Sequence, residues 1–337
     1  MKKIIIDIYG GDNGPEAIIN GALAVLAERK DIGMVFAGEK RLVERIASSQ
    51  KADLSRISFI DTKTFITNHD NPKNIFRGFD GTSLVLSLEE AKINDEVLGL
   101  LSCGNTGAVL IGSIFRLGLI TGVSFPSLAS ALPLPGIGGF VCLLDCGAMV
   151  DCKPENLKEF ALFGSSYMEC AYGIKNPRVG LLNVGTEEGK GNELAKAAYP
   201  LIKALPINFT GNMEGCDLLG GKFDVCVADG FSGNVLLKNC EAVGLTAHGF
   251  AERLSSESND RRVKEALTML SASLYADFAY NDLGCSILLG TKKIVAKPHG
   301  KASEKTIISS LRQFLSLSDG DFVNKLTASL KRKELKS

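Results

Sequence analysis

The sequence predicts an α/β protein built on a parallel sheet. Five times along its 337 residues, an apolar segment is followed by a loop of small residues and then by an amphipathic segment. The apolar segments do not alternate between apolar and polar residues, so each is expected to be a strand covered by helices on both faces. Hydrophobic residues make up 45% of the chain, enough for the large core that layers of helix, sheet and helix require.

The first residues of the expected helices support this division of the chain. Pro15 and Pro154 are each followed by a glutamate, which is typical of a first helical turn. Asn192 and Asn234 are expected to be N-caps. Ligands of open α/β proteins bind where the strands end, so all five loops are expected to open on one edge of the sheet. The five segments begin at Lys3, Val97, Phe140, Arg178 and Asp224.

Residues 241–280 depart from this pattern and are expected to form two helices around the polar break "SSESND". Apolar residues of the second helix recur with the period of an α-helix. Two interpretations are open. The hairpin packs on the core or on a second copy of the chain, or it lies on a membrane surface with Arg261, Arg262 and Lys264 near anionic headgroups. The apolar face contains Val263, Ala266, Leu267, Leu270 and Leu274.

Charge and cysteine usage narrow the class of protein. The chain has 38 Lys and Arg residues against 38 Asp and Glu residues, so no overall field favours nucleic acid and no such partner is expected. The nine cysteines have neither zinc-site nor disulfide-scaffold spacing, which indicates reduced thiols and a cytoplasmic protein. The first apolar run ends at Asp7, too early for the core of a signal peptide. Residues 117–144 lack charge but contain three prolines, so two buried strands joined by a loop are expected there.

Two glycine-rich segments come close to nucleotide-binding motifs without matching them. The segment "GTEEGKGN" is one residue too short for a P-loop, and Gly191 stands where the magnesium-binding Ser or Thr belongs. The segment "GGDNG" lacks the GxGxxG spacing. Four aspartates could hold magnesium, but cap and loop roles are favoured for them, so neither a cofactor nor a metal is expected. These aspartates are Asp7, Asp12, Asp145 and Asp151.

The loop "SCGNTG" has the composition of an anion site. Successive backbone N–H groups of Gly104, Asn105, Thr106 and Gly107 can point into one concavity that no side chain blocks. The structural alternative is an ordinary tight turn between a strand and a helix.

Two further loops and one histidine add polar groups. "EEGKGNE" contributes Lys190, a point charge among glycines, and "DGFSGN" places Asp229 and Gly233 at the start of a helix. His299, in "KPHGKAS", is a candidate proton donor or phosphate contact. The alternatives are a solvated lysine, a structural cap and a surface histidine. Five lysines could form a basic docking face or a solvated rim, and these are Lys292, Lys293, Lys297, Lys301 and Lys305.

Six segments, in this order, resemble the bacterial phosphate acyltransferases of phospholipid synthesis, the PlsX family. The similarity covers nearly the whole chain, and residues 1–330 are assigned to a single domain that includes the hairpin at 241–280. The segments are "IDIYGGDNGPEAI", "SCGNTGA", "LLDCGAMVDCKPENLKEFALFGSSY", "VGLLNVGTEEGKGNEL", "NFTGNMEG" and "VADGFSGNVLLK".

The resemblance implies that a fatty acyl group moves from acyl carrier protein to inorganic phosphate. The resulting acyl phosphate then serves a membrane acyltransferase that acts on glycerol 3-phosphate. The resemblance also implies a homodimer, a fold like that of isocitrate and isopropylmalate dehydrogenases, and peripheral association of a cytoplasmic enzyme with the membrane through a helical region.

The roles of individual residues follow as a hypothesis of direct attack by phosphate. Backbone N–H groups around Asn105 and Thr106 hold phosphate, and Lys190 with Asn192 or Asn234 stabilises developing charge. Lys190 or His299 protonates the leaving thiolate. The phosphate-binding set is completed by Gly104, Gly107, Asp229 and Gly233.

Three alternatives to this hypothesis are retained. A covalent route would pass through Cys103, which stands where the family usually has alanine. A second reading is a nicotinamide-dependent dehydrogenase on the related fold. A third is a non-catalytic scaffold that presents acyl carrier protein at the membrane.

Overall fold

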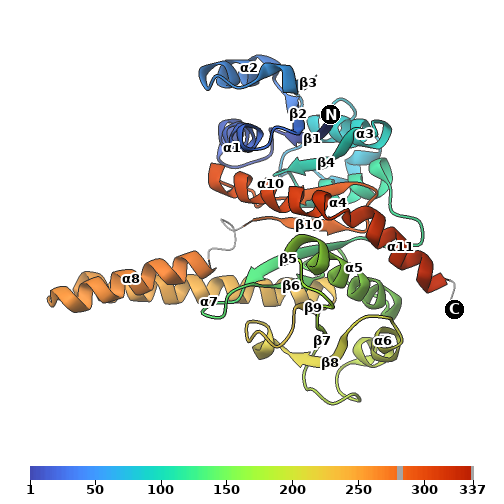
Figure 1. The fold of residues 1–337 in the computed structure, drawn as a ribbon, viewed down its shortest axis with the longest axis vertical. Coiled ribbons are helices and arrows are strands. Elements are labelled where there is room, and N and C mark those ends of the chain that lie inside the picture. Colours follow the sequence, from blue (N-terminus) through green and yellow to red (C-terminus); the bar gives the residue numbers. More distant parts are fainter. Residues whose placement is uncertain (279–283, 335–337) are drawn as a thin grey trace. The chain divides into compact units, whose positions relative to one another are not determined.

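The computed structural model describes residues 1–278 and 284–334, with side chains as far as Lys331, and the chain folds into two compact units. The first unit comprises Met1–Ala129, Ser166–Lys175 and Asn281–Ser337. The second comprises Ser130–Ser165 and Asn176–Tyr280 (Figure 1). The assignment of 1–330 to a single domain stays a prediction.

The first unit contains a mostly parallel sheet whose strands follow the order β3-β2-β1-β4-β11-β10-β5. The first five of these strands pair in parallel, whereas β10 is antiparallel to both of its neighbours. Every residue of β2 is buried, which agrees with the unbroken apolar segments of the sequence. The strands are β1 (Lys2–Asp7), β2 (Ile32–Gly38), β3 (Ile57–Asp61), β4 (Val97–Ser102), β5 (Ser127–Pro133), β10 (Ser286–Leu289) and β11 (Ile294–Lys297).

Helices of the first unit begin close to where the sequence predicts. Pro15 lies in the first turn of α1, and α1 packs closely on α10, where a Cβ at Gly21 would lie 2.7 Å from the Cβ of Ile307. The helices are α1 (Gly14–Glu28), α2 (Lys40–Ser49), α3 (Ser83–Ile93), α4 (Thr106–Gly112), α10 (Glu304–Asp319) and α11 (Phe322–Glu334). Short 3-10 or π turns are η1 (Leu54–Arg56), η2 (Pro72–Phe76) and η3 (Ser113–Leu117).

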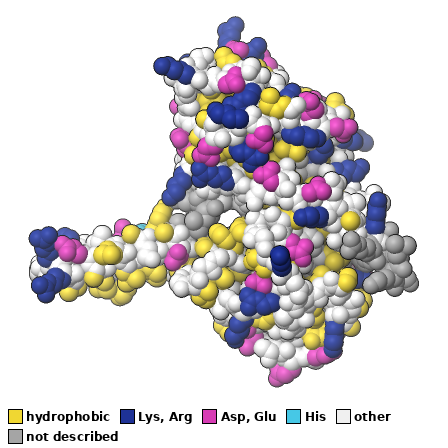
Figure 2. Space-filling view, viewed as in Figure 1, with side chains coloured by type: hydrophobic (Ala, Val, Ile, Leu, Met, Phe, Trp, Pro, Cys, Tyr) yellow, Lys and Arg dark blue, Asp and Glu magenta, His cyan; other side chains and the backbone are white. Residues whose placement is uncertain are grey.

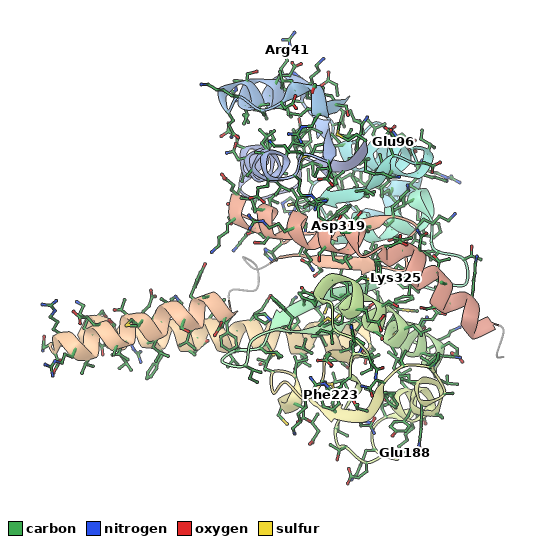
Figure 3. All side chains as sticks on the ribbon, viewed as in Figure 1. Arg41, Glu96, Glu188, Phe223, Asp319 and Lys325 are labelled. Carbon is green, nitrogen blue, oxygen red and sulfur yellow. The ribbon has the colours of Figure 1, made fainter. Side chains whose placement is uncertain are left out.

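The second unit has its own sheet, in the order β5-β6-β9-β7-β8. The second half of β5 is antiparallel to β6, and the other pairs are parallel. Phe223, labelled in Figure 3, belongs to the core beneath this sheet together with Val141 and Met213. α5 (Pro154–Tyr172) begins in the second unit, and its residues from Ser166 onward belong to the first. The remaining elements of the second unit are β6 (Phe140–Leu144), β7 (Val179–Asn183), α6 (Glu193–Lys203), β8 (Phe209–Glu214), η4 (Gly215–Asp217), β9 (Val225–Val227), α7 (Gly230–Glu257) and α8 (Arg261–Phe278).

The α/β class and all five strand-loop-helix segments are confirmed, with two corrections. The sheets are not wholly parallel, because β5 and β10 run against their neighbours. Asn192 is an N-cap as predicted, but Asn234 is not, because α7 begins at Gly230 and is capped by Asp229. The uncharged stretch 117–144 does contain two strands, β5 and β6, joined by a loop.

The expected hairpin is present, but its first helix is longer than predicted. α7 runs without interruption for 28 residues from the loop at Asp229 to the turn at 258–260, and α8 returns beside it (Figure 1). Residues 279 and 280 of the predicted hairpin lie outside the described part of the chain. Within that part, no helix combines the length and apolar character that crossing a membrane requires.

The two hairpin helices contact each other through small, polar and aromatic residues. A Cβ at Gly244 would overlap the Phe278 side chain, and the Ser255 hydroxyl donates a hydrogen bond to the Lys264 carbonyl oxygen at 3.1 Å. His248 Nδ1 lies 2.8 Å from the Ser271 hydroxyl. Of the predicted apolar face, Val263, Ala266 and Leu270 are exposed, and Leu267 and Leu274 are half-buried. Most of this face is therefore exposed in the described part of the chain, whereas Phe278 at the end of α8 packs on the core of the second unit.

Candidate active site

Three loops of the first unit meet at the ends of β1, β4 and β11. A Cβ at Gly10, which has a φ of +82°, would overlap the Cα of Gly104, so only glycine permits this approach. The Asp12 N–H donates to the Gly300 carbonyl oxygen at 2.6 Å, and Asn13 Nδ2 donates to the Lys301 carbonyl oxygen at 2.9 Å. Within this unit the strand-end loops therefore share one edge, as predicted.

The Cys103–Gly104 peptide group in "SCGNTG" is held from both ends by buried side chains. The Gly104 N–H donates to Ser102 Oγ at 3.2 Å, and that hydroxyl donates to Asp7 Oδ2 at 2.7 Å. Lys297 Nζ donates to the Cys103 carbonyl oxygen at 3.4 Å and to the Pro298 carbonyl oxygen at 2.7 Å. The orientation of this peptide group is thus set from inside the protein, and the Gly104 N–H is already engaged.

The next residues of the loop form the start of α4. Asn105 is the N-cap, and its Oδ1 accepts a hydrogen bond from the Ala108 N–H at 3.1 Å. The first N–H groups of a helix have no acceptor within it, which applies to Thr106 and Gly107. A Cβ at Gly107 would lie 2.7 Å from Pro72 Cγ, so packing also requires glycine there. The donors that remain for an anion are the N–H groups of residues 105–107.

Burial changes the acid–base properties of three groups around this loop. It raises the pKa of Asp7 to about 6, although hydrogen bonds from Ser83, Ser102 and the Tyr9 N–H act in the opposite direction. Burial also raises the pKa of the Cys103 thiol to about 12, so the thiolate is scarce near neutral pH. The pKa of the Lys297 ammonium is lowered by burial.

His299 is an exposed residue on the loop that follows β11. Its Nδ1 accepts a hydrogen bond from the Lys301 N–H at 3.2 Å. In the neutral ring the proton is therefore assigned to Nε2, which can serve as a donor. The loop places His299 beside residues 12 and 13 through the hydrogen bonds at Gly300 and Lys301.

The predicted basic docking face needs a correction. Lys297 is only 8% exposed and is bonded to carbonyl oxygens inside the first unit. Lys293 is half-buried and donates to the Val97 carbonyl oxygen at 2.8 Å. Lys292, Lys301 and Lys305 are exposed, so three of the five lysines remain surface groups.

In the second unit, the loop after β6 is fixed by a buried carboxylate. Asp145 is fully buried and accepts hydrogen bonds from the N–H groups of Gly147, Ala148 and Met149 at 3.2, 3.0 and 2.6 Å. A Cβ at Gly233 would overlap the Asp145 carbonyl oxygen, so Gly233 lets α7 begin against this loop. The magnesium alternative finds no support at Asp145, whose carboxylate serves the backbone.

Asn234 lies on α7 beside the same loop. A Cβ added at Gly147 would lie 3.6 Å from Asn234 Cγ, so the amide group borders Gly147. This neighbourhood follows from α7 starting at Gly230, five residues earlier than an N-cap at Asn234 would require.

Asp229 and Asn192 each have the structural role that the sequence left open. Asp229 Oδ1 accepts hydrogen bonds from the Phe231 and Ser232 N–H groups at 3.0 and 2.9 Å. Asn192 Oδ1 accepts one from the Ala195 N–H at 2.9 Å. Asn192 Oδ1 and Asp229 Oδ1 therefore cap helix starts, which leaves the Asn192 amide nitrogen as the donor to offer a substrate.

Lys190 is carried by a loop whose backbone is well anchored. Asn183 Nδ2 donates to the Lys190 carbonyl oxygen at 3.1 Å, and Asn212 Nδ2 donates to the Glu187 carbonyl oxygen at 2.8 Å. Glu188, labelled in Figure 3, accepts from Lys203 at 3.0 Å. The Lys190 side chain is 56% exposed, with its ammonium nitrogen 4.0 Å from a Glu187 oxygen. The charge is held loosely enough to reach a ligand.

A cavity of about 500 Å³ lies in the second unit at the ends of β7 and β9. Asn192 and Asp229 both line it, so it adjoins two of the predicted site residues. The sequence analysis missed this cavity. A signal was present in apolar residues that stand among the polar ones after β7 and at the start of α7, namely Val184, Phe231 and Val235, all of which are exposed.

The predicted residues thus form two groups, one in each unit. Gly104, Asn105 and His299 lie on strand-end loops of the first unit, and Thr106 and Gly107 open α4 there. Lys190 and Asn192 share one loop of the second unit, and Asp229, Gly233 and Asn234 form the start of α7 in the same unit.

Comparison with known proteins supports the resemblance along the chain. A family profile described as "Fatty acid synthesis protein" matches residues 2–325. A phosphate acyltransferase of Bacillus cytotoxicus is 38% identical over 312 residues, which are 92% of this chain and 93% of that protein. The phosphate acyltransferase of Bacillus thuringiensis strain Al Hakam is 39% identical over 313 residues, again 92% of this chain and 93% of the relative.

Solved structures share the fold at 14% sequence identity. A phosphotransacetylase from Streptococcus pyogenes aligns with a TM-score of 0.62 over 96% of this chain and 94% of that one. A 4-hydroxythreonine-4-phosphate dehydrogenase from Burkholderia phymatum aligns with a TM-score of 0.50 over 94% of this chain and 98% of that one. The dehydrogenase-like α/β fold that the resemblance implied is thereby confirmed. By its motifs, its length and its similarity to these relatives, the chain belongs to the family of bacterial phosphate acyltransferases.

Proposed function

We propose that this enzyme takes a fatty acyl group from acyl carrier protein and passes it to inorganic phosphate, giving an acyl phosphate for phospholipid synthesis. The observation that carries the proposal is the 38% identity with a phosphate acyltransferase over 92% of the chain. The fold shared with a phosphotransacetylase agrees with acyl transfer to phosphate. The carrier protein as donor and the use in phospholipid synthesis come from the resemblance.

The reaction requires little acid–base catalysis from the protein. Phosphate carries negative charge near neutral pH and can attack the thioester carbonyl carbon directly. A carbon–oxygen bond forms, the carbon–sulfur bond breaks, and the carrier leaves as a thiolate that takes up a proton. The protein must align the reactants and stabilise the charge that develops on the carbonyl oxygen.

The described residues suit these tasks. N–H groups of Asn105, Thr106 and Gly107 are the proposed phosphate ligands, because the rigid Cys103–Gly104 peptide group places them at the start of α4. Gly104, Asp229 and Gly233 support the loops by packing and capping rather than through a free donor.

Lys190 is the proposed group for charge stabilisation, with the amide nitrogen of Asn192 or Asn234 as a second donor. Lys190 is exposed and makes one long ion pair, so its ammonium can turn toward a substrate. The same lysine or Nε2 of His299 would protonate the leaving thiolate.

The covalent alternative through Cys103 is disfavoured by the environment of its thiol. Cys103 is 1% exposed, and burial raises its pKa to about 12. A thiol with that pKa supplies almost no nucleophile near pH 7. Direct attack by phosphate needs no such thiolate.

We also propose the partners that the resemblance implies for the hairpin, a membrane surface and a second copy of the chain. Its helices contact each other through small, polar and aromatic residues, and several further large apolar side chains are exposed. Met269 is 74% exposed, and Val243 and Phe250 are 59% and 53% exposed. Figure 2 shows hydrophobic side chains along the hairpin and basic ones at its end. This pattern suits an amphipathic surface element of a peripheral protein.

A two-substrate assay tests the proposed function. Purified protein is mixed with palmitoyl-acyl carrier protein, with and without inorganic phosphate, and free carrier thiol and acyl phosphate are measured. Phosphate-dependent release of the thiol is expected. A scaffold would release none under any condition, and a nicotinamide-dependent dehydrogenase would instead bind the dinucleotide in a fluorescence titration.

A separate measurement tests the membrane partner. The protein is mixed with vesicles that contain phosphatidylglycerol and floated through a density gradient. Met269→Glu should lower the floated fraction, while Glu188→Gln, on a loop distant in sequence from the hairpin, should not. Equal flotation of both variants would count against the hairpin as the membrane contact.

A further inference from the structure

The cavity of the second unit is the feature that points beyond the transfer reaction itself. We propose that it binds the hydrocarbon chain of the acyl substrate and thereby sets the preferred chain length. The inference rests on the proposed acyl transfer. Its volume of about 500 Å³ falls within the range of small-molecule sites, roughly 300–1,000 Å³.

The wall of the cavity is built mainly from apolar side chains of three neighbouring elements. Leu181 and Leu182 come from β7, Leu194 and Ala195 from α6, and Leu236 from α7. Leu181 is 1% exposed, so the inner wall is part of the folded core rather than a loose surface groove. A lining of this kind favours an apolar ligand, because hydrocarbon leaves water most readily on such a surface.

Part of the polar lining of the cavity, which consists of Asn183, Asn192, Asp229, Ser232 and Asn239, is hydrogen-bonded to the protein's own backbone. Asn183 Oδ1 accepts from the Val184 N–H at 2.8 Å, and its Nδ2 donates to the Lys190 carbonyl oxygen at 3.1 Å. Asn192 Oδ1 and Asp229 Oδ1 accept from helix N–H groups at 2.9 to 3.0 Å. Nucleotides and sugars need convergent free donors and acceptors. A hydrocarbon chain needs none.

The mouth of the cavity has exposed apolar side chains, and a bound hydrocarbon chain would remove them from water. Val184, Phe231 and Val235 all line it and are 80%, 63% and 55% exposed. An acyl chain in the cavity would remove these side chains from water as well as itself, and each buried methylene group stabilises binding by about 0.8 kcal/mol, or roughly fourfold.

The position of the cavity indicates where the reacting end of the acyl substrate lies. Asn192 lines the cavity and belongs to the same loop as Lys190, the group proposed to stabilise charge. The thioester end is therefore expected at this loop, with the methyl end among the leucines of β7 and α6.

The test narrows the cavity and measures the preference for chain length. Ala195 is 8% exposed and lines the cavity, whereas Ala197 is exposed on the same helix and serves as the matched control. Ala195→Leu should lower kcat/KM for hexadecanoyl-acyl carrier protein by roughly tenfold to sixtyfold, the cost of displacing two to three methylene groups. It should change kcat/KM for the octanoyl substrate much less, and Ala197→Leu should change neither.

A binding measurement separates this inference from the proposed function. Wild-type protein should enhance the emission of a fluorescent hexadecanoic acid, and Val235→Asp, which places a charge at the cavity mouth, should weaken its binding by tenfold or more. Val235 is 55% exposed, so this variant is expected to fold. If neither the wild type nor the variants transfer acyl groups to phosphate, the proposed function fails. The binding of the fluorescent fatty acid then tests by itself whether the cavity holds a hydrocarbon chain.

Two outcomes would overturn the inference. In one, the ratio of hexadecanoyl to octanoyl kcat/KM is the same in Ala195→Leu and Ala197→Leu within about threefold. In the other, Ala195→Leu and Val235→Asp change the oligomeric state, measured by light scattering, and leave fatty-acid binding intact. The cavity would then be a contact with a second copy of the chain.

Discussion

Replacing Asp7 with asparagine should change how the stability of the first unit depends on pH. Burial raises the pKa of this carboxyl from 3.8 to about 6 in the folded protein. The folded state therefore holds the proton more tightly than the unfolded state does. The stabilisation from this difference is complete below about pH 4, is lost as the pH rises from about 4 to 6, and is absent above that range.

The magnitude follows from the size of the shift. One pKa unit corresponds to about 1.4 kcal/mol, so the shift of Asp7 corresponds to about 3 kcal/mol. The asparagine of Asp7→Asn does not titrate. The variant also loses the carboxylate that accepts the Ser102 hydroxyl, which changes its unfolding free energy by an amount that does not depend on pH. Relative to the variant, the wild-type protein should lose about 3 kcal/mol of unfolding free energy between pH 3.5 and pH 7.

Hydrogen exchange provides the measurement, because it reports the stability of one segment of a chain with two units. Exchange of the β1 amides, Lys2–Asp7, is followed by mass spectrometry across the pH range and corrected for the intrinsic rates. A difference between the proteins that stays constant with pH, or that favours the wild type as pH rises, would refute the reasoning about buried Asp7. Asp95→Asn, at an exposed carboxylate of the same unit, controls for general changes in charge.

Three further predictions concern catalysis and folding. Lys190→Ala should lower kcat about a hundredfold, since that is the typical cost of one lost preorganised donor, and a loss below tenfold in the two-substrate assay would reject the proposed role. Cys103→Ala should leave turnover nearly unchanged, and mass spectrometry of quenched wild-type reactions should show no acyl adduct on the protein. Gly233→Ala should destabilise the second unit by about 1–3 kcal/mol, because the added Cβ overlaps the Asp145 carbonyl oxygen and the structure around it must shift. Urea unfolding that matches the wild type would contradict this packing.

The family and the fold class could be predicted from the sequence because both depend on patterns of neighbouring residues. Unbroken apolar segments followed by glycine-rich loops and helix starts repeat five times, and each repeat is encoded within about 25 neighbouring residues, close to the size of a βα unit. The cap at Asn192 and the first-turn proline at Pro15 were predictable because capping depends on the next few residues alone.

The site was predictable only in part. The loop "SCGNTG" could be singled out by its composition, but Gly104 turned out to have its N–H engaged by Ser102. Asp229 could be a ligand or a cap on sequence grounds, and it caps α7. Residue type alone does not reveal which donors and acceptors are already satisfied, since their partners come from other parts of the chain.

What the sequence by itself determined is the set of local elements: the strands, the loops that follow them, the helix starts and the family motifs. Only the tertiary structure decided that Lys297 is buried beneath the Cys103–Gly104 peptide group, that the apolar face of α8 is exposed, and that a cavity opens beside Asn192. The physical reason is that burial and hydrogen-bond satisfaction depend on contacts between residues far apart in the chain. Lys297 and Cys103 are separated by 194 positions, and no local pattern records that they meet.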